Sequence, residues 1–131
     1  MWTRFMDMHS GGGCKVGYEY IYIEAPQAEA EIIFQNRFGR NPHRVTCTCC
    51  GEDYSPDEGT LQAVTAFDRN CAWEKAGYVE RGDSSRSYAG AYVTLEEFMR
   101  NPKAKTLFIS AAEIKPEERK GELQEEGYVW R

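Results

Sequence analysis

The stretch YEYIYIEAPQAEAEIIFQNRFG, residues 18–39, decides the fold, because it joins a strand directly to a helix. Residues 18–23 alternate between two kinds of side chain, which predicts a β-strand with two different faces. Pro26 stands at the first position of the helix expected over residues 26–39, and Gly39 stands where that helix should stop. The strand faces are Tyr18, Tyr20 and Tyr22 against Ile21 and Ile23, and the core stripe of the helix is Ala30, Ile33, Phe34 and Phe38.

Further elements follow on both sides of this stretch. Strands are expected over residues 2–8, 44–47 and 105–111, and the glycine-rich residues 9–17 connect the first two strands. Ser55, with Pro56 and two acids behind it, resembles a helix start, so a helix is expected over residues 61–73. A second short helix over residues 95–100 begins with a capping box. The core side of the 61–73 helix would be Leu61, Val64, Ala66 and Phe67, with Cys71 one turn beyond.

These elements predict an α+β fold in one small domain over residues 1–131. Its sheet should be mainly antiparallel, with two to three helices and a cysteine-rich turn. Residues 81–92 are expected to form a long loop. The acidic C-terminal segment, residues 113–131, reads as an acidic helix or a solvated arm, and Trp130 is the one residue in it expected to dock.

The chain carries a net charge of −5, which opposes general attraction to nucleic acid or to an anionic membrane surface. No apolar stretch is long enough for a membrane span, and the N-terminus does not read as a signal peptide. We therefore expect a cytoplasmic protein. In that compartment the five cysteines should be thiols or metal ligands.

The stretch RVTCTCCGEDY, residues 44–54, holds three of the five cysteines. Two of them form a C-x-x-C turn followed by glycine, which is half of a typical zinc site. The alternative is that these cysteines are buried thiols, and redox or nucleophilic chemistry is less favoured, because the turn follows a strand and not a helix N-terminus. The metal-ligand candidates are His43, Cys47, Cys50 and Cys71.

The stretch HSGGGCK, residues 9–15, and a nearby run of basic residues are the second candidate site. Consecutive glycines let main-chain N–H groups converge on an anion, although the spacing matches no established phosphate motif. The alternatives are a hairpin tip for the glycines and a favourable helix dipole for the arginines. The candidate ligand-binding residues are Ser10, Gly11, Gly12, Gly13, Lys15, Arg37, Arg40 and Arg44.

Three stretches, DMHSGGGCK, YIYIEAPQAEAEIIFQNRFGRNP and VTCTCCGEDYS, resemble a family of small uncharacterised bacteriophage proteins. The resemblance covers about the first half of the chain and implies a phage accessory protein in the bacterial host cytoplasm. It carries over no catalytic residues and favours a non-catalytic protein that binds a host or defence component in a counter-defence role. Two alternatives remain open: a protein that sequesters a phosphorylated ligand or nucleotide through the glycine loop, and a zinc-stabilised module that contacts nucleic acid.

Overall fold

The computed structural model describes residues 1–7, 16–47, 53–69, 94–102, 105–125 and 128–130. Its main sheet has four strands in the order β4-β1-β2-β5. Strand β1 pairs antiparallel with both of its neighbours, whereas β2 and β5 run parallel. The strands are β1 (Trp2–Asp7), β2 (Tyr20–Ile23), β4 (Tyr54–Gly59) and β5 (Thr106–Ile109).

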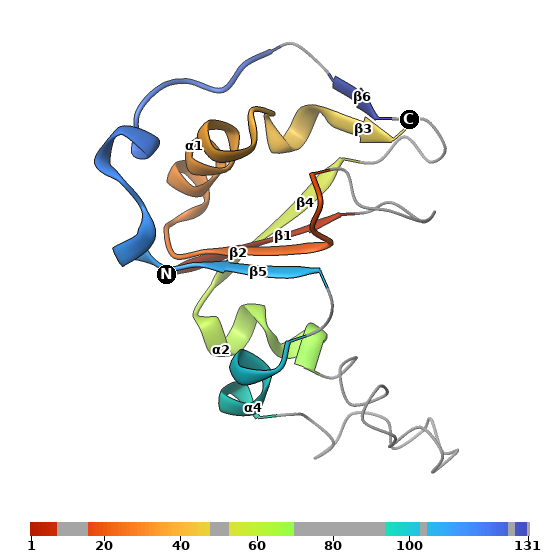
Figure 1. Ribbon diagram of the computed structural model, residues 1–131, viewed down its shortest axis with the longest axis vertical. Coiled ribbons are helices and arrows are strands. Elements are labelled where there is room, and N and C mark those ends of the chain that lie inside the picture. The colour runs from red at the N-terminus through yellow and green to blue at the C-terminus, as the bar shows by residue number, and fades with distance from the viewer. Residues whose placement is uncertain (8–15, 48–52, 70–93, 103–104, 126–127, 131) are drawn as a thin grey trace.

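Helices cover both faces of this sheet. Helix α1 (Gln27–Phe38) lies on one face, and α2 (Leu61–Val64) and α4 (Leu95–Arg100) lie on the other (Figure 1). The predicted α+β class is confirmed, with a sheet that is mixed because β5 joins it parallel to β2.

Helix α1 forms as its sequence predicts. It ends at Gly39, which adopts the left-handed conformation (φ 75°) and donates its N–H to the carbonyl of Gln35 at 2.7 Å. Its inward residues Ala30, Ile33 and Phe34 are fully buried, and Phe38 packs half-buried beside them. The stripe expected from the sequence is therefore the stripe that meets the sheet.

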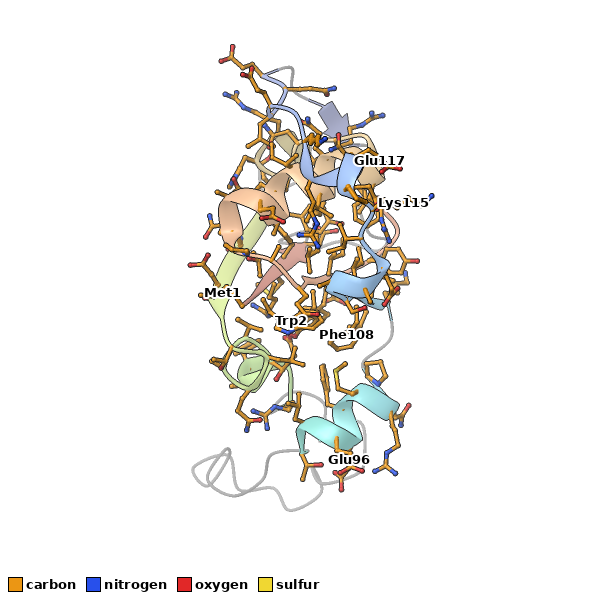
Figure 2. All side chains as sticks on the ribbon, turned by 90° about the vertical axis from the view of Figure 1, so that its left-hand side faces the viewer. Met1, Trp2, Glu96, Phe108, Lys115 and Glu117 are labelled. Atoms are coloured by element: carbon orange, nitrogen blue, oxygen red, sulfur yellow. The ribbon has the colours of Figure 1, made fainter. Side chains whose placement is uncertain are left out.

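The sheet has a hydrophobic core on each of its two faces. On the α1 side, Ile21 and Ile23 of β2 join Phe5, whereas Tyr20 and Tyr22 face the opposite core with Val64 and Phe98. Trp2 and Phe108 contact edge to face, with ring centroids 6.5 Å apart, at the rim of this second core (Figure 2). The alternation in β2 thus places its isoleucines in the core on the α1 side and its tyrosines in the opposite core, which we call the aromatic core.

The helix start expected at Ser55 is wrong, because residues 54–59 form the edge strand β4. Pro56 lies opposite Phe5 and is tolerated there because an edge strand has one side without ladder hydrogen bonds. The cap belongs to Thr60, whose side chain accepts a hydrogen bond from the N–H of Ala63 at 3.1 Å. Helix α2 begins after it at Leu61, and residues 66–69 are also helical.

The expected core face of this second helical region is correct for Val64 and Leu61 but wrong for Phe67. Phe67 is 59% exposed, and the buried residue one position later is Asp68. The face that meets the sheet therefore contains residues 61, 64 and 68, and a polar contact described below fixes it.

Helix α4 begins and ends as expected. Thr94 and Glu97 form the predicted capping box, and the helix stops before Asn101 and Pro102. Phe98 is its buried residue.

The C-terminal segment is neither the helix nor the solvated arm expected from its acidity. It forms two short 3₁₀ turns, η4 (Ala111–Glu113) and η5 (Pro116–Arg119), and runs along α1 (Figure 1). It ends in β6 (Tyr128–Trp130), which pairs parallel with β3 (Val45–Cys47) after the 3₁₀ turn η1 (Pro42–Arg44). Residues 81–92, expected as a loop, lie outside the described residues.

Candidate functional site

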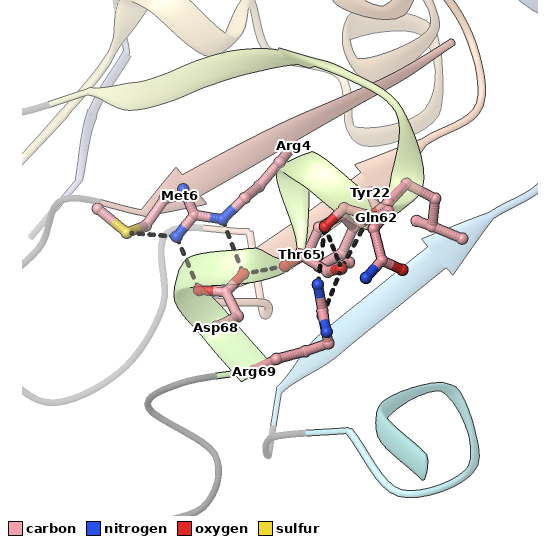
Figure 3. A network of polar contacts seen from close by, with 8 residues as sticks. Arg4, Met6, Tyr22, Gln62, Thr65, Asp68 and Arg69 are labelled. Carbon is pink, nitrogen blue, oxygen red and sulfur yellow. Dashed lines mark hydrogen bonds and ion pairs between the residues drawn. The ribbon is translucent and has the colours of Figure 1, made fainter. Parts of the chain in front are cut away.

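A buried ion pair joins the main sheet to the helical region after α2. Arg4, in the middle of β1, points into the aromatic core, and its Nε and Nη2 donate to Oδ2 and Oδ1 of Asp68 at 2.7 and 2.8 Å (Figure 3). The two side chains are 9% and 0% exposed. This bidentate geometry is the strongest arrangement that an arginine and a carboxylate can make, and burial makes it costly to break.

Aromatic side chains surround this pair. Tyr22 donates its hydroxyl to Oδ2 of Asp68, so this carboxylate accepts hydrogen bonds from two strands of the sheet. The Arg4 guanidinium lies 5.3 Å from the ring centroid of Tyr20 and 5.7 Å from that of Phe67. We call these five residues the Arg4 cluster: Arg4, Tyr20, Tyr22, Phe67 and Asp68.

A second arginine supports the helical side of the cluster. Arg69 is buried, and its Nε donates to Oγ1 of Thr65 at 3.1 Å while its Nη2 donates to the carbonyl of Gln62 at 2.9 Å. Thr65 in turn donates to the carbonyl of Leu61 at 2.6 Å. These bonds fix the helical backbone that carries Asp68 (Figure 3). Phe67 directly precedes Asp68 on this backbone.

Burial affects the titration of one member of the cluster, Tyr20. Burial, with smaller effects from the carboxylates of Glu19 and Asp68, raises the pKa of the Tyr20 phenol. Tyr20 therefore remains neutral throughout the physiological range. The carboxylate of Asp68 is shared between a guanidinium and a phenol, an arrangement suited to holding elements in place. The part of the cluster that reaches the surface is the ring of Phe67.

The predicted basic residues are dispersed among different contacts. The Arg37 guanidinium binds Glu118 of the C-terminal segment at 2.9 and 3.0 Å, and this bond raises the pKa of Arg37 and lowers that of Glu118 to about 2. Arg40 donates to the carbonyl of Gly39 at 3.0 Å, and Arg44 is an exposed residue of η1. The structure therefore engages Arg37 in holding the C-terminal segment.

The predicted metal ligands are described only in part. His43 lies on η1, where its Nε2 is 2.5 Å from Oε2 of Glu31, a carboxylate contact of the kind that orients metal-binding histidines. Cys47 ends β3, paired with Trp130. In the described part of the chain, no group of three His, Cys, Asp or Glu side chains is arranged to hold a metal ion. Outside the described residues lie Cys50, Cys71, Ser10, Gly11, Gly12, Gly13 and Lys15.

The Arg4 cluster was missed because both of its charged members look unremarkable on their own. The available signals were positional. Arg4 shares a strand face with Trp2 and Met6, and Asp68 lies seven residues after Leu61 on the inward side of the helical region. A charge at an apolar position of one element is informative when a second element carries the opposite charge at such a position.

Comparison of the chain with protein-family models, curated proteins and solved structures finds no match. Among the described residues, no helix combines the length and the apolar character needed to cross a membrane.

Proposed function

We propose that the protein is a non-catalytic binding protein that engages a protein of the bacterial host or of its defence. The observation that supports this proposal is the position of Phe67. The residue is 59% exposed, and its ring lies against a guanidinium that is itself held by a buried carboxylate. A large aromatic side chain kept in one orientation loses little conformational entropy on binding, which is why such residues dominate the energetics of protein interfaces.

The neighbouring helix offers a second apolar side chain on the same layer. Met99 of α4 is 39% exposed, and α4 lies with α2 on the side of the sheet away from α1 (Figure 1). Methionine adapts its shape to a partner surface, which complements a fixed aromatic ring. The proposed contact surface is therefore the helical layer that carries Phe67 and Met99.

Affinity capture from a lysate of phage-infected bacteria tests the proposal. The tagged protein should enrich a host or defence protein, and Phe67→Ala should reduce that enrichment at least about tenfold, as truncation of an interface anchor does. Gln62→Ala is the matched control, because Gln62 is exposed and lies one to two helical turns from Phe67. This variant should leave the enrichment unchanged. Equal enrichment by the wild-type protein and by Phe67→Ala would remove this surface from the proposal.

The phosphate-ligand alternative draws on Arg40 and Arg44, which are exposed near the end of α1. Binding of a nucleotide to the folded protein would raise its melting temperature by mass action. A thermal-shift series with nucleotides at millimolar concentration therefore separates the two functions. A shift that disappears in an Arg40→Ala/Arg44→Ala variant would favour the ligand-binding alternative.

A further inference from the structure

The C-terminal segment is bound to α1 mainly through its main chain. We call residues 113–125 the strap, and the side chains of Gln35, Asn36 and Asn41 the amide clasp. The clasp amides donate to strap carbonyls at 2.7 to 2.9 Å, and the side-chain Oε1 of Gln35 accepts from the N–H of Gln124 at 2.7 Å. The strap carbonyls bound are those of Glu118, Lys120, Glu122 and Gln124.

These four carbonyls lie at every second residue, from Glu118 in η5 to Gln124 beyond the positive-φ residue Gly121. Because every residue has a main-chain carbonyl, contacts of this kind recognise the path of the backbone more than a particular sequence. Two ion pairs then fix the position of the strap along α1. In one the arginine belongs to α1, and in the other it belongs to the strap. Arg37 of α1 binds Glu118 of the strap, and Arg119 of the strap binds Glu29 of α1.

The strap packs few side chains into the hydrophobic cores. Of its described residues, Ile114 alone is buried in a core, and Leu123 is half-buried. Most other strap residues are exposed, as are Lys115 and Glu117 at the outer edge of the molecule (Figure 2). The strap from residue 115 to residue 125 is therefore mostly polar, and β6, which follows it and pairs with β3, would move with it.

The backbone between the two 3₁₀ turns can serve as the hinge. Ile114 and Lys115 are extended, with φ of −96° and −79°, and Pro116 follows. Pro116 confines Lys115 to extended conformations, so the strap changes its direction through the dihedral angles of Ile114. A different direction of the strap therefore needs a change at few dihedral angles.

We propose that the amide clasp also accepts the strap of a second copy of this chain, so that two molecules exchange straps in a closed dimer. The second copy fits because its strap carries the same carbonyl spacing and the same pair of opposite charges. Exchange of an identical element is a low-cost route to a symmetric dimer, since each chain recovers the contacts that it gives up. At low concentration the tethered strap occupies its own clasp, because the tether gives it a high effective concentration.

A pair of charge-reversal variants tests this exchange. Arg37→Glu places two carboxylates opposite each other within one chain, and Glu118→Arg places two guanidinium groups there. In a dimer formed by one copy of each variant, both exchanged contacts join opposite charges. Light scattering after size-exclusion chromatography, with reductant present, should find each variant alone at the 15.0 kDa of one chain and the equimolar mixture at twice that mass.

The combined Arg37→Glu/Glu118→Arg chain is the matched control, because it restores opposite charges within one molecule. It should remain monomeric at the concentration at which the mixture dimerises, and it should melt as the wild-type protein does. For the wild-type chain, the dimer fraction should rise as concentration increases towards the millimolar range. A mixture that stays at the mass of one chain, while the combined variant folds normally, would overturn the exchange.

Discussion

Two arginine–carboxylate pairs in this protein have the same bidentate geometry and different surroundings. Arg4–Asp68 is enclosed between the sheet and the helical layer, with side chains 9% and 0% exposed, whereas Arg37–Glu118 lies at the surface, 28% and 17% exposed. Removing one partner of a buried pair leaves the other charge buried and unpaired, which is costly. A surface charge that loses its partner is solvated by water instead. Burial therefore decides which pair holds the fold and which pair holds a segment at the surface.

The largest effect is expected from Asp68→Ala. This change leaves the Arg4 guanidinium charged and buried, so the free energy of unfolding should fall by about 3–5 kcal/mol. Urea denaturation measures the loss. The double variant Arg4→Leu/Asp68→Leu removes both charges and should lose less than Asp68→Ala. A loss below about 1 kcal/mol for Asp68→Ala would show that the pair is solvated in solution.

An intermediate effect is expected from Tyr22→Phe. The substitution removes a hydrogen bond to a charged acceptor, and it keeps the ring stacked on Phe108, with centroids 4.8 Å apart. The free energy of unfolding should fall by about 1.5–3 kcal/mol. In a double-mutant cycle, the loss should be smaller when Asp68 is already alanine, because the acceptor is gone. Strictly additive losses would mean that the hydroxyl acts elsewhere.

The smallest effect is expected from Glu118→Gln. The free energy of unfolding should fall by less than about 1 kcal/mol at pH 7. The hydrogen bond from Arg37 lowers the pKa of Glu118 to about 2 from its ordinary 4.5. A lowered carboxyl pKa gives stability that is complete above about pH 4.5 and is lost as the pH falls towards 2. The difference between wild type and variant in hydrogen exchange of the strap should shrink over this range.

The exposed neighbour Glu117 supplies the control for that measurement. Glu117→Gln should leave strap exchange unchanged at every pH. A difference between wild type and Glu118→Gln that persists at pH 2 would contradict the assignment of the effect to the Arg37–Glu118 pair.

Sequence reasoning succeeded where structure depends on nearby residues. The capping box of Thr94 with Glu97 and the helix end at Gly39 both involve contacts within four residues, so their signals are complete in the local sequence. It failed at β4, because Pro56 belongs to a strand only through its pairing with β1, opposite Phe5. Local preference for a helix start was overridden by a partner far away in the chain.

The candidate site shows the same limit. The alternation in β1 places Arg4 on the apolar face, but only the fold reveals that Asp68 meets it there. The strap could not be predicted, because the clasp binds main-chain carbonyls, and every residue has one. Acidity indicated a solvated segment, and it did not indicate that amide side chains of α1 would pair with that segment.

The parallel pairing of β2 with β5 has a consequence for how the chain folds during synthesis. Tyr20 lies beside Thr106 in the register, so most of the chain must leave the ribosome before the sheet can be completed. Contacts between such distant residues form late and slow the folding of the whole domain. Until then the tyrosine face of β2 lacks both β5 and the Phe98 side chain that covers it. The nascent protein therefore leaves the tyrosine face of β2 uncovered for most of its translation.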